Sequence, residues 1–125
     1  MKDAGIGPGQ VGYVNSHGTG TSVNDSTETR ALKLAFGEHA SKLAMSSTKA
    51  MHGHTLGAAG AIESTAAILG LTNGFMPPTV NFSEPDPECD LDCIPNTARC
   101  AEFEYALSNS FAFGGLNAVL AYRRI

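Results

Sequence analysis

The order of strand, glycine-containing turn and helix occurs twice between Val11 and Gly74, and this repeat restricts the fold more than any other feature. The segment VGYVN, residues 11–15, has the β-branched and aromatic content of a short strand and runs into the turn SHGTGT. The next segment, NDSTETRALKLAFG, begins with N-cap residues, has an apolar face and ends at a glycine. These features predict a helix over residues 24–37.

The second unit repeats this order with a strand over KLAMSST, Lys42 to Thr48. Gly53 interrupts the chain after this strand, and helical character returns from Gly57 to Asn73. The MPP sequence that follows prevents any extension of that helix. Two consecutive units of strand and helix favour an α/β fold with parallel strands.

The remaining residues predict a loop and a pair of strands. Prolines and acidic residues over 83–100 are typical of an exposed loop, with one short strand near Leu91–Ile94. Residues 104–113 and 116–124 predict two strands joined through Gly114 and Gly115. Because no repeat or linker interrupts the chain, we expect one domain over residues 1–125.

Composition excludes several classes of function. No apolar run approaches the roughly 20 residues needed to cross a bilayer, and the start MKDAGIGPGQ lacks the apolar core of a signal peptide, which together predict a cytoplasmic protein without a membrane partner. A net charge of -4 without a cluster of lysine and arginine disfavours nucleic acid as a partner. Three cysteines confined to residues 89–100 predict reduced thiols rather than a disulfide framework.

Two histidines are the first candidates for chemistry. His17 and His54 each follow a predicted strand and precede a helix, the position where open α/β sheets form their binding crevice. Glycines and alanines surround both histidines, which leaves room for a ligand or for another backbone. Ordinary core or surface histidines beside a closely packed helix are the alternative interpretation.

Lys49 and Glu63 form a second candidate pair. Glu63 lies within an otherwise apolar helix, so it needs a counter-charge if it is buried, and Lys49 could provide one. The alternative is that both side chains face water, as most lysines and glutamates do.

Metal and nucleotide sites have little support. His17, His52 and His54 lack a neighbouring carboxylate, and the spacing of the three cysteines fits no common zinc motif. The sequence GTGT lacks the lysine of a phosphate-binding loop. We therefore expect no metal and no nucleotide cofactor.

Four motifs in order give a stronger indication: NSHGTGT at 15–21, STKAMHGHTLGAAGAIES at 47–64, PPTVNF at 77–82 and SNSFAFGGLNAVL at 108–120. Together they resemble the C-terminal part of the β-ketoacyl-acyl-carrier-protein synthases, and the resemblance covers nearly the whole chain. It implies the C-terminal half of a thiolase-like fold, an α/β structure with a mixed sheet packed with helices. The implied function is 3-oxoacyl-acyl-carrier-protein synthase, a condensing acyltransferase of fatty-acid or polyketide-like biosynthesis.

The resemblance also implies roles for single residues. His17 and His54 match the histidines that hold the malonyl thioester carbonyl and stabilise the enolate formed on decarboxylation. Lys49 matches the lysine beside them, and Glu63 matches its carboxylate partner. Asp25 and Glu28 match supporting carboxylates of the same network, and Thr19 and Thr21 match threonines that contact the phosphopantetheine arm. Phe113 matches a mobile gate whose backbone N–H joins the oxyanion hole, with Gly114 and Gly115 allowing it to move.

Some residues depart from this pattern or stay without a role. Residue alternation alone makes Phe111 and Phe113 ordinary strand residues, and only the resemblance selects Phe113. His52 receives no role. Leu116 replaces the polar residue that commonly follows the paired glycines, which makes this ending closer to synthases of nodulation-factor or aryl-polyene type.

The nucleophilic cysteine of the family lies in an N-terminal half that has no counterpart here, since Cys89, Cys93 and Cys100 lie in an acidic, proline-broken stretch. We therefore expect a fragment or one half of a split enzyme, inactive alone. The implied partners are acyl carrier protein and that N-terminal half, in a homodimer. The alternative is a non-catalytic subunit, similar to a chain-length factor or serving only dimerisation.

Overall fold

The strand β1, Val11–Asn15, lies at the centre of the sheet in this computed structural model, which describes residues 1–125. It pairs in parallel with β2, Ala44–Ser46, on one side and with β5, Tyr105–Ala112, on the other. The strand β6, Leu116–Arg123, pairs with β5 in antiparallel orientation. The sheet order is therefore β2-β1-β5-β6, and the expected mixed α/β architecture is confirmed.

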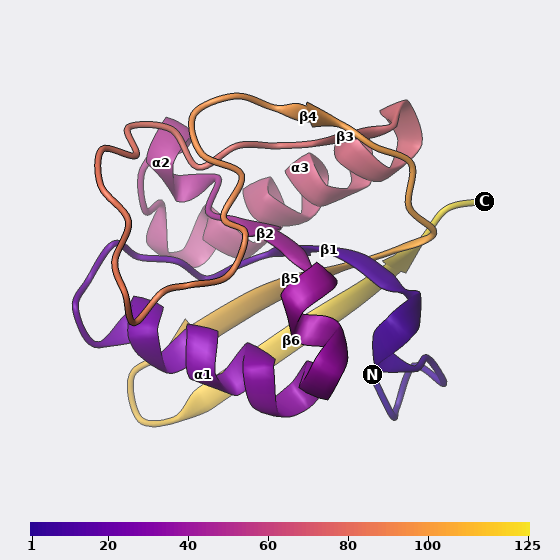
Figure 1. The fold of residues 1–125 in the computed structure, drawn as a ribbon, viewed down its shortest axis with the longest axis horizontal. Coiled ribbons are helices and arrows are strands. Elements are labelled where there is room, and N and C mark those ends of the chain that lie inside the picture. Colours follow the sequence, from indigo (N-terminus) through magenta and orange to yellow (C-terminus); the bar gives the residue numbers. More distant parts are fainter.

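Two helices cover opposite faces of this sheet, so the molecule has three layers (Figure 1). The helix α1 spans Asn24–Phe36, and the helix α3 spans Ala59–Asn73. Short helical turns occupy the connections: η1 Pro8–Gln10, η2 Gly37–Lys42, α2 Lys49–His52 and η3 Leu56–Ala58.

The apolar core is divided into two clusters because β1 sends neighbouring side chains to opposite faces. Val14 lies in the cluster beneath α1, with Leu32 and Phe36 of that helix. Tyr13 lies in the cluster beneath α3, with Ala67 and Leu71. A register shift between Val11 and Tyr13 places Val11 on the same face as Val14. Each helix is thus fixed to the sheet by its own apolar stripe.

The second half of the chain departs from the sequence prediction in two places. The strand near residues 91–94 is reduced to one bridge between Ala44 and Asp92, because Ile94 and Asn96, with φ of 49° and 62°, turn the chain around Pro95. A small antiparallel pair that was not predicted joins β3, Phe75–Met76, to β4, Arg99–Cys100. Two-residue strands carry too little pattern to be recognised.

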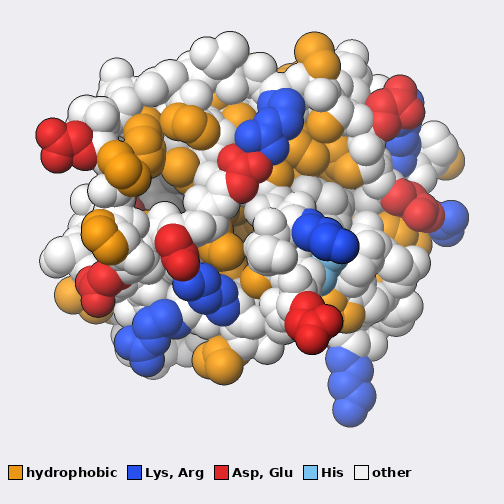
Figure 2. Space-filling view, viewed as in Figure 1, with side chains coloured by type: hydrophobic (Ala, Val, Ile, Leu, Met, Phe, Trp, Pro, Cys, Tyr) orange, Lys and Arg blue, Asp and Glu red, His pale blue; other side chains and the backbone are white.

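The surface exposes both charged and apolar side chains. On the face shown in Figure 2, lysine and arginine side chains lie scattered among acidic ones rather than in one patch. No helix has the length and apolar character required to span a membrane. Large apolar side chains are exposed on α3 and β6: Ile62, Ile68, Leu69, Leu116, Val119 and Leu120.

Gly70 is a site where the fold requires glycine, because a Cβ at this position would lie 2.5 Å from the carbonyl oxygen of Phe75. We expect Gly70→Ala to lower the free energy of unfolding by about 1 to 3 kcal/mol. Gly60 lies in the same helix, with its nearest contact at 3.5 Å, so Gly60→Ala should be neutral or stabilising by up to about 1 kcal/mol. Urea denaturation measures the stability of both variants. Equal midpoints for Gly70→Ala and the wild type would show that the helix tolerates a Cβ at Gly70.

Candidate functional site

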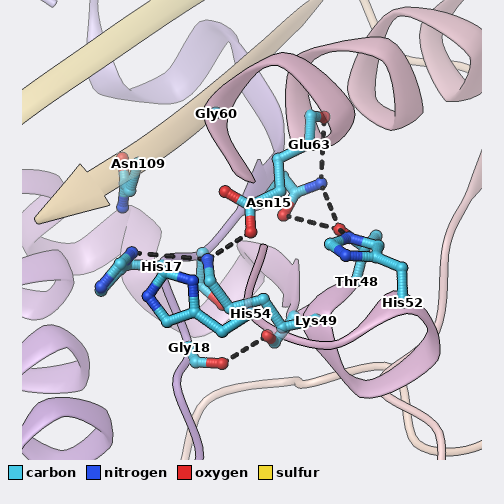
Figure 3. A network of polar contacts seen from close by, with 12 residues as sticks. Asn15, His17, Gly18, Thr48, Lys49, His52, His54, Gly60, Glu63 and Asn109 are labelled. Carbon is cyan, nitrogen blue, oxygen red and sulfur yellow. Dashed lines mark hydrogen bonds and ion pairs between the residues drawn. The ribbon is translucent and has the colours of Figure 1, made fainter. Parts of the chain in front are cut away.

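The two candidate histidines lie together at the edge of the sheet where β1 and β2 end. His17 comes two residues after β1, and His54 follows β2 after the short helix α2. The centroids of their rings are 5.5 Å apart, and the ring planes meet at 87°. The expected convergence of these two side chains is confirmed, and Figure 3 shows them within one network of polar contacts.

A buried carboxylate holds the backbone at His17. The two carboxylate oxygens of Glu28 accept hydrogen bonds from the N–H groups of His17 and Gly18, each at 2.9 Å. Glu28 lies on α1, and Asn109 of β5 donates to the same carboxylate at 3.0 Å. One side chain therefore joins α1, β5 and the turn that follows β1.

Gly18 brings the two turns into contact. Its φ is 40°, and a Cβ there would lie 2.5 Å from the Cβ of Ser47. Ser47, directly after β2, donates its hydroxyl hydrogen to the Gly18 carbonyl at 2.5 Å. This close approach explains why the turn after β1 needs glycine at this position.

Lys49 and Glu63 form a buried ion pair. Their side chains are 5% and 1% exposed, so the alternative of two solvated side chains is wrong. The ammonium nitrogen Nζ of Lys49 also lies 3.4 Å from Nδ1 of His17. The second carboxylate oxygen of Glu63, Oε2, is buried without a hydrogen-bond partner. The pair thus places a compensated cation directly beside one histidine ring.

Hydrogen bonding selects the same tautomer in both rings. The ammonium group of Lys49 donates toward Nδ1 of His17. The backbone N–H of Leu56 donates to Nδ1 of His54 at 3.2 Å. A neutral imidazole carries only one hydrogen, so in each ring that hydrogen is on Nε2. The site therefore offers an Nε2–H donor from each ring.

The pKa of His17 is lowered from its ordinary value of 6.5. Burial is the largest cause, followed by the positive charge of Lys49, and these outweigh the opposing effect of the Glu28 and Glu63 carboxylates. His17 is only 8% exposed, so its imidazolium form would lose most of its hydration. The ring is consequently neutral near pH 7.

The two predicted threonines lie farther along the same turn, and Asp25 lies in the first turn of α1. The hydroxyl oxygens of Thr19 and Thr21 are 3.0 Å apart, and Asp25 accepts a hydrogen bond from the N–H of Gly20. The side-chain amide of Asn24 donates to Asp25 at 3.0 Å and to Glu28 at 3.4 Å. Asp25 is therefore linked to the buried carboxylate, although it is itself only half-buried.

A separate cavity of about 310 Å³ lies between the start of α1, the end of β2 and residues 79–93. Thr21, Asp25 and Glu28 line it, whereas His17, His54 and Lys49 do not. The predicted site residues thus divide between the two sides of the turn after β1.

The structure places Phe111, rather than Phe113, beside the histidines. The ring centroid of Phe111 is 5.7 Å from that of His17. Phe113 is fully exposed at the tip of the β5–β6 hairpin, where Gly114 and Gly115 have φ near 80°. The implied roles of Phe113 and of these glycines stay predictions.

Asn109 and Phe111 contribute to the site although no sequence pattern selected them for it. Both lie on β5, which reaches His17 only because β5 pairs in parallel with β1, with Ser108 opposite Asn15. The order of strands in the sheet, if known, would have identified both.

The cysteines have no feature of a nucleophilic site. All three are free. Burial raises the pKa of Cys89 and of Cys93, with nearby acidic groups adding to the effect, so their thiolate forms are disfavoured as predicted. No group of three histidine, cysteine or acidic side chains is arranged to hold a metal ion.

Comparison with known sequences matches residues 1–83 to the family "Beta-ketoacyl synthase, C-terminal domain". The whole chain is 52% identical to Nodulation protein E of Rhizobium sp. (strain N33), of which it covers 31%. It is 51% identical to 3-oxoacyl-[acyl-carrier-protein] synthase 2 of Synechocystis sp., with 99% of the chain covering 30% of that protein. The chain therefore spans about a third of the length of these relatives.

Solved structures give the same result. The chain matches a chain of a complex described as a type II PKS acyl-carrier protein with its ketosynthase bound to the hexaketide. The TM-score is 0.96 and the identity 42%, over 99% of this chain and 30% of the matched chain. A beta-ketoacyl synthase from Burkholderia phymatum STM815 matches with a TM-score of 0.93 and the same identity and coverage. These structures confirm the expected thiolase-like fold.

The lowered pKa of His17 predicts a pH-dependent stability. The unfolded chain takes up a proton on this ring near its ordinary pKa of 6.5, before the folded chain does, so the free energy of unfolding should fall as the pH drops through that value. The His17→Gln variant should lose this contribution to the pH dependence of the free energy of unfolding. Urea denaturation from about pH 7.5 to about pH 5.5 measures it, and identical slopes would contradict the prediction.

The buried ion pair predicts a non-additive double-mutant cycle. Lys49→Met leaves the carboxylate of Glu63 buried without its cation and should lower the free energy of unfolding by about 3 to 5 kcal/mol. Adding Glu63→Gln removes that uncompensated charge, so the double variant should be more stable than Lys49→Met alone. Denaturant titration of the wild type, both single variants and the double variant tests this, and additive losses would refute it.

Proposed function

We propose, because this chain belongs to the β-ketoacyl synthase C-terminal domain family, that it carries the decarboxylation residues of a 3-oxoacyl-acyl-carrier-protein synthase. The observation that carries this proposal is the pair of histidines, His17 and His54, with ring centroids 5.5 Å apart and each accepting a hydrogen bond at Nδ1, which leaves Nε2 as the donor. Two such donors suit a single oxyanion that develops between them.

The proposed reaction is decarboxylative Claisen condensation. The malonyl thioester loses its carboxylate as carbon dioxide, and the electron pair of the broken carbon–carbon bond moves into an enolate. The Nε2–H groups of His17 and His54 donate to the thioester oxygen, where the negative charge develops. The enolate carbon then attacks the acyl thioester, forms the new carbon–carbon bond and releases the thiolate that carried the acyl group.

The neighbouring charges keep the ring of His17 neutral. Lys49 beside Nδ1 of His17 opposes protonation of that ring, and burial acts in the same direction. Glu63 compensates the lysine charge, so the pair fixes the tautomer without presenting an unpaired cation to the substrate. Glu28 supports the same site through the backbone of the turn after β1.

The acyl group requires a nucleophilic cysteine outside this chain. We propose an N-terminal half of the synthase as the partner that supplies it, because the chain spans about a third of its relatives and has no cysteine in a suitable setting. The exposed apolar side chains of α3 and β6 offer a surface on which such a segment can be buried. In the assembled enzyme, Phe113 with Gly114 and Gly115 would form the gate, with its backbone N–H in the oxyanion hole.

The second partner is acyl carrier protein, whose phosphopantetheine arm carries the substrate and would contact Thr19 and Thr21. The scattered basic side chains on the face in Figure 2 give this chain no concentrated docking patch there. We therefore place much of the carrier contact on the N-terminal half. The complete enzyme is proposed as a cytoplasmic homodimer in which residues 1–125 form one domain, without a metal or nucleotide cofactor.

The test is to combine this chain with an N-terminal half and to measure carbon dioxide release from malonyl carrier protein. His54→Ala should abolish release, with a loss of at least about 100-fold, because a donor to the developing charge is removed. His39→Gln is the matched control, since His39 lies on η2 and bonds the Val11 carbonyl instead of facing the site. It should leave the rate unchanged.

Undiminished release in the His54→Ala enzyme would refute the assigned role. A properly assembled complex that never releases carbon dioxide would instead favour the non-catalytic subunit.

A further inference from the structure

His52 joins the buried network to the turn that carries His54 (Figure 3). It is the last residue of α2 and is half-buried. Its Nδ1 lies 2.8 Å from the carbonyl oxygen of Gly53, and its Nε2 lies 3.2 Å from the hydroxyl oxygen of Thr48. We propose that His52 is a positioning residue for His54, an inference that rests on the proposed function.

The hydrogen bonds around His52 have a definite direction. A carbonyl oxygen only accepts, so Nδ1 of His52 carries a hydrogen and donates it to Gly53. In the neutral ring, Nε2 is then an acceptor for the one hydroxyl hydrogen of Thr48, and at 3.2 Å it is closer than the other acceptor, Oδ1 of Asn15, at 3.4 Å. The Thr48 oxygen in turn accepts from the side-chain amide of Asn15 at 3.1 Å. Asn15 also donates to the backbone carbonyl of Glu63 at 3.2 Å. The chain of donors therefore runs from the core to the Gly53 carbonyl.

The turn over residues 53–56 has few other restraints. Gly53 has φ of 75° and Leu56 has φ of 51°, so the backbone reverses direction on both sides of His54. The N–H of Gly53 donates to the Lys49 carbonyl, and the N–H of Leu56 donates to Nδ1 of His54. The bond from His52 fixes the remaining polar group at the entry, the Gly53 carbonyl. Without it, the peptide unit that precedes His54 can rotate.

The effect on chemistry follows from this geometry. His54 is itself exposed, so packing does little to hold its ring. In the proposed reaction its Nε2–H has to point toward the thioester oxygen, and it keeps that direction only while the turn places Nδ1 against the Leu56 N–H. His52 thus sets the direction of one donor without touching the substrate.

Two substitutions separate the two bonds of His52. In His52→Asn, the side-chain amide nitrogen takes the place of Nδ1 and can still donate to the Gly53 carbonyl. In His52→Gln, the longer side chain takes the place of Nε2 and reaches Thr48 instead. His52→Leu makes neither bond. All three are measured in the full chain and in the chain assembled with an N-terminal half.

The first measurement is the hydrogen-exchange rate of the Leu56 amide by NMR, together with the ¹⁵N shifts of the His54 ring. Exchange should be about fivefold to tenfold faster in His52→Gln and His52→Leu and within about twofold of wild type in His52→Asn. The Tyr13 amide, in the central strand, reports whether the fold is intact. Equal Leu56 rates in all variants, or His52→Asn behaving like His52→Leu, would overturn the proposal.

The second measurement is carbon dioxide release by the assembled enzyme. The kcat should fall about tenfold in His52→Gln and His52→Leu with KM unchanged, and His52→Asn should restore it. Unchanged kcat in His52→Leu would overturn the positioning role. An assembled wild-type enzyme without release would refute the proposed function, while the exchange rates would still decide whether His52 orients His54.

Discussion

The carboxylate of Glu28 is the contact on which the site depends. It is 2% exposed, and it accepts hydrogen bonds from two successive backbone N–H groups at His17 and Gly18 and from the side chain of Asn109. Burying a carboxylate costs free energy unless its oxygens are hydrogen-bonded, so these bonds hold the helix, the turn and β5 in their relative positions. The orientation of His17 is therefore determined by the tertiary structure of the whole domain.

Electrostatics then select the chemical form of this site. A lysine placed beside a histidine disfavours the imidazolium, and a glutamate paired with that lysine prevents a net positive charge in the core. Hydrogen bonding alone would fix the tautomer, but burial and the lysine also fix the protonation state of His17. Lys49 thus acts on the ring electrostatically, from a position that its buried partner holds.

Local patterns predicted much of this arrangement. The extent of α1 followed from its apolar face and the glycine after it. The meeting of His17 with His54 followed from strand ends at one edge of a parallel sheet. The contribution of Asn109 and Phe111 did not follow, because it depends on β5 pairing with a strand that is distant in the sequence. Periodicity reports which residues form a strand but not which strand lies beside it.

The strand β6 has a consequence for association of the molecule. It forms one edge of the sheet over eight residues, and one side of its backbone has N–H and C=O groups without strand partners. Val119 and Leu120 add apolar surface along that edge. Such an edge is a template for pairing with a further strand, whether from a covering segment or from another copy of the molecule.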